Sequence, residues 1–188
     1  MRNHKLLFTI TLSYFLLGFV NIHFALLGIF CMTIPFFLVF KTKKKTWCQG
    51  YCPRAALYTT TLKHKGWNSL NTPNYFVHGE MRWVMLTYFA VSLFFIIMTT
   101  IAVAKGVRAP MNYLRFFVVY PIPFSMPQLI QFSKVTPWIT HLAYRFYSMM
   151  MTTTILGFTL GLIYRPRTWC TICPVGTMSD SLLKKKRR

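Results

Sequence analysis

The chain has 188 residues, of which 54% are hydrophobic and 18% aromatic, and its 22 Lys and Arg face only two acids, Glu80 and Asp180. A formal charge of +20 suits either nucleic acid or an anionic membrane surface. Uncharged runs of membrane-spanning length are present, which decides for the membrane and against nucleic acid as a partner. The composition therefore predicts an all-α integral membrane protein and excludes a soluble domain.

The first apolar region, residues 6–40, carries no formal charge. One spanning helix needs about 20 residues and two need about 40, so the length alone does not decide between one helix and two. Asn21 and His23 lie in the middle of the region, where side chains facing lipid would be costly. We predict two short helices, at about 6–20 and 24–40, joined by a tight turn. One long tilted helix is the alternative.

Two later uncharged runs, 83–104 and 146–164, predict further spanning helices. Between them, residues 116–133 are apolar but contain three prolines, which disfavour a continuous helix. We expect a re-entrant or interfacial segment there, because irregular backbone at membrane depth must be shielded by protein. The predicted fold is a single membrane domain, 1–188, with about four transmembrane helices and this proline-broken segment.

Clusters of Lys and Arg determine the predicted orientation. The positive-inside rule places such clusters in the cytoplasm. Both termini and the two cysteine motifs, 47–53 and 169–174, are then cytoplasmic in a multi-pass protein of the plasma membrane. The basic clusters lie at 1–5, 41–45, 63–65, 165–167 and 184–188.

The two cysteine motifs share a pattern. Each begins Thr-Trp-Cys and ends Cys-Pro, with the spacing Cys-x3-Cys in the first and Cys-x2-Cys in the second. Four thiolates in two close pairs can bind one tetrahedral metal ion or one iron–sulfur cluster, and a proline after a ligating cysteine also ends the bacterial ferredoxin motif. Basic neighbours favour the thiolate form that metals need. The predicted ligands of an iron–sulfur cluster, preferentially [4Fe–4S], are Cys48, Cys52, Cys170 and Cys173.

Two other chemistries remain open for these cysteines. A zinc-binding structural or assembly protein would also use four Cys. A quinone-linked membrane thiol–disulfide oxidoreductase would use two pairs, although those cysteines belong on the oxidising side of the membrane. The fifth cysteine, Cys31, stands alone in an apolar run, and we expect it only to pack.

The paired Trp-Cys-x2/3-Cys-Pro motifs resemble those of membrane-bound polyferredoxin-type proteins, the NapH/NosR/CcoG group. The stretch 21–28, with Asn-Ile-His-Phe and Leu-Leu-Gly, is similar to small bacterial members. The resemblance implies a membrane electron carrier between a quinol or cytoplasmic donor and a redox partner that contains flavin or iron–sulfur centres. The chain lacks the appended Cys-x2-Cys-x2-Cys-x3-Cys ferredoxin domain of larger members. We therefore expect a subunit or accessory protein rather than a stand-alone enzyme, bound to membrane lipid, with quinone a further candidate partner.

No residues are predicted to be catalytic, because paired carboxylates, a phosphate loop and a serine triad are all missing from the sequence. Two histidines bear on the fold. His23 is expected to form an interhelical hydrogen bond rather than bind haem, and His141 is expected at the surface.

Overall fold

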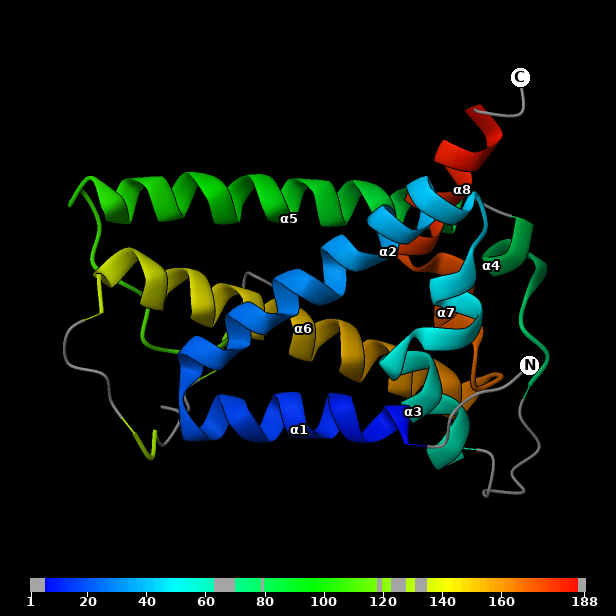
Figure 1. The fold of residues 1–188 in the computed structure, drawn as a ribbon, viewed down its shortest axis with the longest axis horizontal. Helices are drawn as coiled ribbons and strands as arrows, with labels where there is room; N and C mark the ends of the chain where they lie inside the picture. The colour runs from blue at the N-terminus through cyan, green and yellow to red at the C-terminus, as the bar shows by residue number, and fades with distance from the viewer. Residues whose placement is uncertain are drawn as a thin grey trace. The chain divides into compact units, whose positions relative to one another are not determined.

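A computed structural model describes residues 6–62, 70–78, 80–117, 120–122, 128–130 and 135–185, and most of these residues are helical (Figure 1). The chain divides into two compact units. The first, here called the motif unit, comprises Met1–Thr11, Cys31–Phe89 and Thr154–Arg188, and it contains both cysteine motifs. The second unit comprises Leu12–Phe30 and Ala90–Thr153.

The helices are predominantly apolar, as the composition predicts. Three segments are long and apolar enough to cross a membrane, namely Ile22–Thr42, Met81–Ala104 and Pro137–Ile163, and the apolar helix Leu7–Val20 is shorter. In chain order the elements are α1 (Leu7–Val20), the 3-10 helix η1 (Ile22–Leu27), α2 (Gly28–Thr42), the π-helical turn η2 (Trp47–Tyr51), α3 (Pro53–Leu62), α4 (Asn74–His78), α5 (Met81–Ala104), β1 (Arg115–Phe116), β2 (Tyr120–Pro121), α6 (Pro137–Ile163), α7 (Thr168–Ile172) and α8 (Pro174–Lys185).

The first apolar region folds as two helices. Asn21 has an extended backbone, with φ −155° and ψ 129°, and its side-chain oxygen accepts a hydrogen bond from the His23 amide. The Tyr14 hydroxyl donates to the Ala25 carbonyl at 3.0 Å. In one straight helix these residues would be about 16 Å apart along the axis, so the chain must reverse between them. The predicted break into two helices is observed, and a six-residue 3-10 helix, η1, follows Asn21 where a tight turn was expected.

The last long helix begins earlier than the sequence suggests. Helix α6 starts at Pro137 rather than at 146, and proline suits the first turn of a helix. Arg145, which the sequence placed just before the span, lies inside this helix and is buried. The expectation that His141 is exposed is therefore wrong, since its side chain is only 3% exposed. His23 is a hydrogen bonder as expected: its ring nitrogens lie 2.6 Å from Asn21 Oδ1 and 3.2 Å from Thr140 Oγ1.

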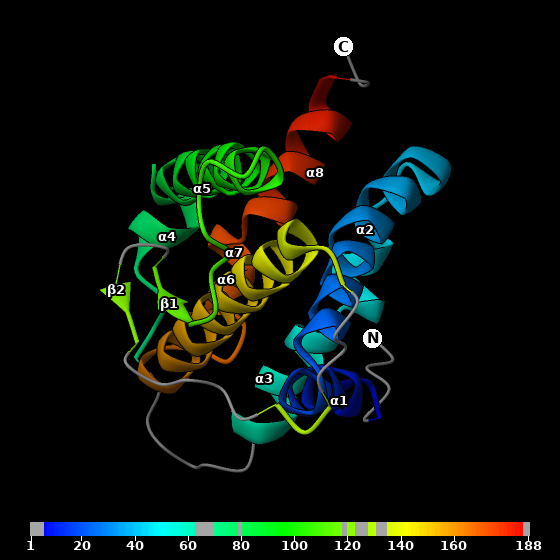
Figure 2. The ribbon, with the colours of Figure 1, turned by 90° about the vertical axis from the view of Figure 1, so that its left-hand side faces the viewer.

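The proline-broken segment 116–133 is non-helical where it is described. A short antiparallel pair forms, with Arg115 opposite Pro121 and Phe116 opposite Tyr120. The Arg115 amide donates to Ser148 Oγ at 3.1 Å, so β1 lies along α6 (Figure 2). Residues 118–119, 123–127 and 131–133 lie outside the described residues. The re-entrant or interfacial position of the segment stays a prediction.

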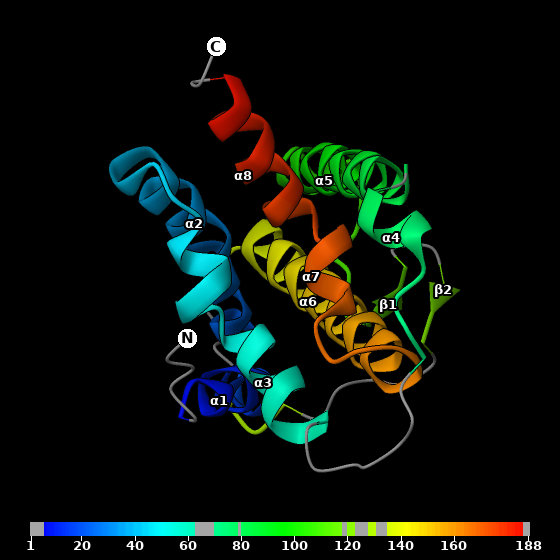
Figure 3. The same cartoon turned by 90° about the vertical axis from the view of Figure 1, so that its right-hand side faces the viewer.

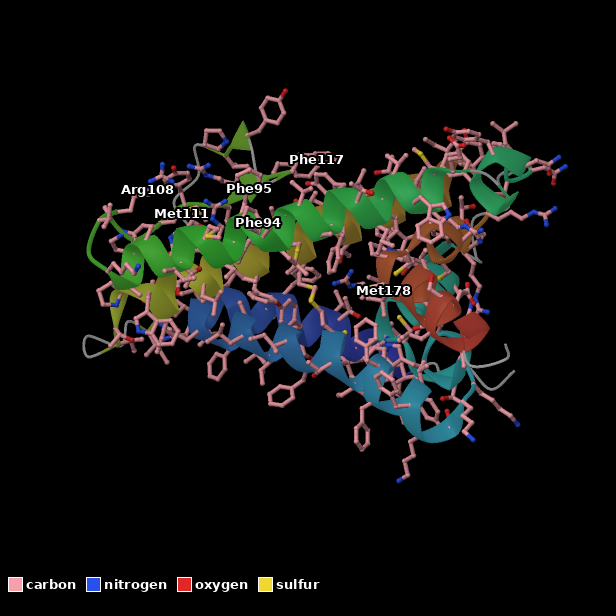
Figure 4. All side chains as sticks on the ribbon, turned by 90° about the horizontal axis from the view of Figure 1, so that it is seen from above. Phe94, Phe95, Arg108, Met111, Phe117 and Met178 are labelled. Atoms are coloured by element: carbon pink, nitrogen blue, oxygen red, sulfur yellow. The ribbon has the colours of Figure 1, made fainter. Side chains whose placement is uncertain are left out.

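The second unit has its own apolar core. Tyr147 of α6 is 2% exposed and donates its hydroxyl proton to the Phe15 carbonyl of α1. A side chain at Gly18 would overlap the Tyr147 ring, so this glycine permits the close approach of α1 and α6. On α5, by contrast, Phe94 and Phe95 are more than half exposed (Figure 4). Their exposure is typical of a helix that faces lipid.

Candidate metal centre

The two cysteine motifs adopt the same local plan. The first cysteine of each lies in a single helical turn, Cys48 in η2 and Cys170 in α7. The second lies at the end of that turn with an extended backbone, with ψ 113° at Cys52 and 126° at Cys173. A following proline disfavours the α conformation at the residue before it, which explains the extended backbone.

The prolines also begin new helices. Pro53 is the first residue of α3 and Pro174 the first residue of α8, the position where a missing N–H costs nothing. The Cys52 carbonyl accepts the Ala56 amide at 3.1 Å, and the Cys173 carbonyl accepts the Thr177 amide at 3.0 Å. Each second cysteine therefore immediately precedes a helix, where backbone N–H groups have no partner within the helix.

The additional residue of the first motif is accommodated by a wider turn. The Cys52 amide donates to the Trp47 carbonyl at 2.9 Å, a bond across five residues that defines a π turn. In the second motif, α7 is a turn of ordinary α-helix. The spacings x3 and x2 thus lead to the same outcome, a first cysteine on a turn and a second cysteine before a helix.

A pair of glycines on α6 brings the two motifs together. Gly157 and Gly161 are one turn apart, and side chains on both would overlap α3, at Tyr58 and at Leu62 respectively. Small residues at this spacing let two helices approach closely. The Tyr58 hydroxyl also donates to the Thr154 carbonyl at 3.3 Å. Because α3 follows the first motif and α6 precedes the second, this packing sets the separation of the two motifs.

Apolar packing continues from this contact into α7. Trp169 and Ile172 are 3% and 1% exposed, and they share one buried cluster with Tyr58 and Leu62. Figure 3 shows α7 leading into α8, with α4 beside it. The tryptophan of the second motif is therefore a core residue that fixes α7, whereas Trp47 of the first motif is only half-buried.

Polar contacts fix the start of α7. Thr168 is 1% exposed; its hydroxyl accepts from the Arg165 amide at 3.2 Å and donates to the Arg165 carbonyl at 2.9 Å. The Thr72 hydroxyl lies 3.1 Å from it. This buried side chain holds the turn between α6 and α7 and thereby orients Cys170.

An ion pair joins the segment before the first motif to the helix after the second. Lys45 pairs with Asp180 of α8, and both side chains are partly exposed. Both charges also act on the Cys48 thiol: Lys45 lowers its pKa and Asp180 raises it. The pair therefore lies close to the predicted ligands, and one of only two acids in the chain is used there.

The four predicted ligands lie near one another. The Cys170 thiol is influenced electrostatically by Cys52, Cys173 and Cys48, and the Cys48 thiol by Cys173 and Cys52. All four are half-buried free thiols. Among the described residues, no three His, Cys, Asp or Glu side chains converge closely enough for a single metal ion. The structure therefore gathers the thiols in one region without the tight grouping of a mononuclear site.

Burial raises the pKa of three of these thiols, Cys48, Cys170 and Cys173, and so favours their protonated form when no metal is present. Desolvation raises the pKa of Cys48 to about 11 and that of Cys170 to about 12. Burial also raises the pKa of Cys173, against the opposing effect of the Gly176 and Val175 amides at the start of α8 and of the Arg54 charge. Metal binding must therefore displace protons, and those amides and the cation are positioned to stabilise the thiolate that results.

Sequence reasoning missed some residues of this region. Cys31 of α2, expected only to pack, lies within electrostatic range of Cys52 and Cys173. Tyr58, Gly157 and Gly161 carry no ligand chemistry, although the spacing of the two glycines could have indicated a helix contact. A pocket of about 430 Å³ beside the second motif was not anticipated either. Its lining is polar and basic, consisting of Asn71, Thr72, Arg165, Arg167, Thr168 and Thr171.

Comparison with known proteins agrees with this geometry. The 4Fe-4S binding domain family matches the chain over residues 24–68 and again over 146–188, and each matched segment contains one Cys-Pro motif. The match supports an iron–sulfur protein. The cofactor of this iron–sulfur protein is accordingly a cluster of the [4Fe–4S] type. Neither the curated proteins nor the solved structures contain a match to the chain.

Proposed function

We propose that this protein is a membrane electron carrier in which Cys48, Cys52, Cys170 and Cys173 together bind one [4Fe–4S] cluster. One observation carries the proposal: two motifs far apart in sequence fold into the same turn–proline–helix plan and meet within one compact unit. A bound cluster supplies reversible one-electron oxidation and reduction.

The residues present fit such a cluster. Four thiolates carry a large negative charge, which Lys45, Arg54 and Arg167 are placed to offset, because each lowers the pKa of at least one of the cysteines. The thiolates of a cluster bind different irons and are spread more widely than the four ligands of one zinc ion. Four cysteines within one compact unit match the ligand number of such a cluster.

The surrounding chain restricts water on one side of the site and leaves access on another. Trp169, Ile172 and Tyr58 form a buried apolar wall next to α7. Such burial, together with N–H groups directed at a sulfur, is among the main factors that set a cluster's potential. On the other side, Arg165 and Arg167, five and three residues before Cys170, line an open pocket. This pocket suits the approach of an acidic region on a redox partner.

The membrane setting follows from the apolar helices. With α1 as a fourth span beside the three longer ones, both motifs belong on one face, and the basic runs favour the cytoplasmic face of the plasma membrane. Electrons would then pass between a quinol or cytoplasmic donor and a partner with a flavin or iron–sulfur centre. The chain would act as an electron-transfer subunit or accessory protein.

A redox titration of protein purified anaerobically in detergent tests the proposed function. The expected result is a visible spectrum that bleaches with a single one-electron potential and is restored on reoxidation. A two-electron titration without bound iron would instead identify a quinone-linked thiol–disulfide oxidoreductase. Redox-silent protein with one zinc per chain would identify a structural or assembly protein. Either result contradicts the proposal.

A further inference from the structure

The second unit contains a group of arginines but no acidic side chain. Arg145 of α6 is 7% exposed, and its Nε has no hydrogen-bond partner among the described residues. The segment that carries Arg115 runs along α6 beside Arg145, because the Met111 amide donates to His141 and the Arg115 amide donates to Ser148. The charges of Arg115 and Arg108 also act on Arg145 electrostatically. Burying an unpaired charge is costly, and such charges are normally matched by an acid or a ligand.

The second unit contains no acid of its own. Its residues, 12–30 and 90–153, include no Asp or Glu. The only acidic side chains of the sequence, Glu80 and Asp180, belong to the motif unit, and Asp180 is paired with Lys45. A ligand from outside the chain can supply the missing negative charge.

The arginines form a graded path from the interior to the surface. Arg145 is buried, Arg115 is half-buried with its Nε also lacking a partner, and Arg108 is exposed in the segment that follows α5 (Figure 4). Arg115 Nη2 donates to the Tyr113 hydroxyl at 2.6 Å, which leaves the proton of that hydroxyl free to donate to an anion. These donors provide the positive charge and the hydrogen-bonding capacity that an oxyanion requires.

The neighbouring histidine does not serve as the counter-group. His141 Nδ1 accepts the Met111 amide at 3.1 Å, which requires that nitrogen to be unprotonated. The other ring nitrogen lies 3.2 Å from Thr99 Oγ1 and can donate to it. His141 is thus neutral and satisfied, so the positive charge of the group resides on the three arginines.

We propose that Arg108, Arg115 and Arg145 form a binding site for a phosphate group. Guanidinium groups bind phosphate through paired, charge-assisted hydrogen bonds, and a graded opening admits a phosphate from the surface. The phosphate has two possible sources, an anionic phospholipid headgroup or inorganic phosphate. The site is independent of the cysteines, which all lie in the motif unit.

Thermal unfolding of the full chain in a nonionic detergent tests the site. Wild-type protein is compared at constant ionic strength with added phosphatidylglycerol, phosphatidylcholine or sodium phosphate. The variants are Arg145→Gln, Arg108→Gln and, as a matched control, Arg82→Gln, because Arg82 belongs to the motif unit and its Nε likewise has no hydrogen-bond partner among the described residues. The expected result is a rise in the Tm of wild type and Arg82→Gln with phosphatidylglycerol but not with phosphatidylcholine.

The variants give the decisive comparison. Loss of one charge-assisted hydrogen bond should weaken phosphate binding about tenfold to a hundredfold in Arg145→Gln and Arg108→Gln. Arg145→Gln should also be at least as stable as wild type when no anion is added, because it removes a buried uncompensated charge. Arg108→Gln, at an exposed position, keeps the test valid if Arg145→Gln does not fold.

The outcomes separate the sources and the alternatives. A gain with sodium phosphate as well as lipid supports the site and identifies free phosphate as a ligand, whereas a gain with phosphatidylglycerol alone supports a lipid headgroup. The proposal would be overturned by equal gains in Tm in wild type, Arg145→Gln and Arg108→Gln, or by an equal gain in Tm with phosphatidylcholine. The proposal would also be overturned if no addition raised the Tm, a result that would point instead to a carboxylate on a partner protein.

Discussion

Replacement of Gly157 by Ala should disrupt the metal centre, although this residue lies in the middle of a helix and binds nothing. A Cβ at this position would overlap the Tyr58 hydroxyl and approach Tyr58 Cζ to 2.6 Å. Tyr58 is fully buried and cannot swing away, so α3 must shift relative to α6. Overpacking of this kind costs about 1–3 kcal/mol. Because Pro53, which follows Cys52, begins α3, the shift separates the two cysteine pairs.

The measurement is the iron and sulfide content per chain after anaerobic purification, together with the Tm. Gly157→Ala should have a lower Tm and less cluster than wild type. Gly50→Ala is the control, because Gly50 lies between Cys48 and Cys52, yet a Cβ there would have no atom within 4 Å. It should keep the cluster. A smaller side chain, Tyr58→Leu, should partly restore cluster content in the Gly157→Ala background, since the two residues are in contact.

The reasoning would be refuted by the reverse pattern. Full cluster content in Gly157→Ala, with loss in Gly50→Ala, would mean that the first motif itself and not the α3–α6 contact controls assembly. Strictly additive effects of Gly157→Ala and Tyr58→Leu would show that these two side chains do not interact.

Four further predictions concern the thiols and the ion pair. Cys170→Ser should abolish the cluster, whereas Cys31→Ser should retain it, as measured by the iron content per chain. An equal loss of iron in both variants would instead identify Cys31 as a ligand. The raised pKa of Cys48, about 11 in the folded protein against an ordinary 9.0, predicts slow alkylation of cluster-free protein at pH 8, about a hundredfold below an unperturbed thiol, as followed by mass spectrometry. By the same shift, cluster-free protein should keep its stability below pH 9 and lose it as the pH rises toward 11, because in this range the Cys48 thiol ionises in the unfolded chain but not in the folded one. A Tm that is constant over this range would contradict this prediction. Asp180→Asn should cost less than about 1 kcal/mol in stability and leave cluster content unchanged, since its pair with Lys45 is partly exposed; a large loss of iron would assign the pair a direct role.

The helices were the most predictable features. Long uncharged runs admit few structures other than helices, and Asn21 marked the break between α1 and α2. The Cys-Pro spacing also dictates local geometry, because the proline restricts the residue before it and favours a helix after it. The local backbone geometry of the motifs therefore follows from the sequence without knowledge of the packing around them.

Features that depend on packing could not be predicted. In the sequence, Arg145 looks like the residue just before a span begins. In the structure, α6 begins eight residues before Arg145, and this arginine is buried. His141 was misplaced for the same reason. The additional residue of the first motif gave no hint of a π turn, and Cys31 resembles any apolar core residue until α2 is placed beside the motifs. Such outcomes depend on tertiary contacts that a local pattern does not contain.

The central claim is that the two cysteine pairs bind one cluster. Its most direct test is EPR and visible spectroscopy, with iron and sulfide analysis, of protein purified anaerobically in detergent from a host that assembles clusters. The account predicts about four irons per chain, absorption that bleaches with dithionite, and loss of both signals on replacement of Cys48 or Cys170 by Ser. Colourless protein without iron, with its four motif cysteines intact, would contradict it.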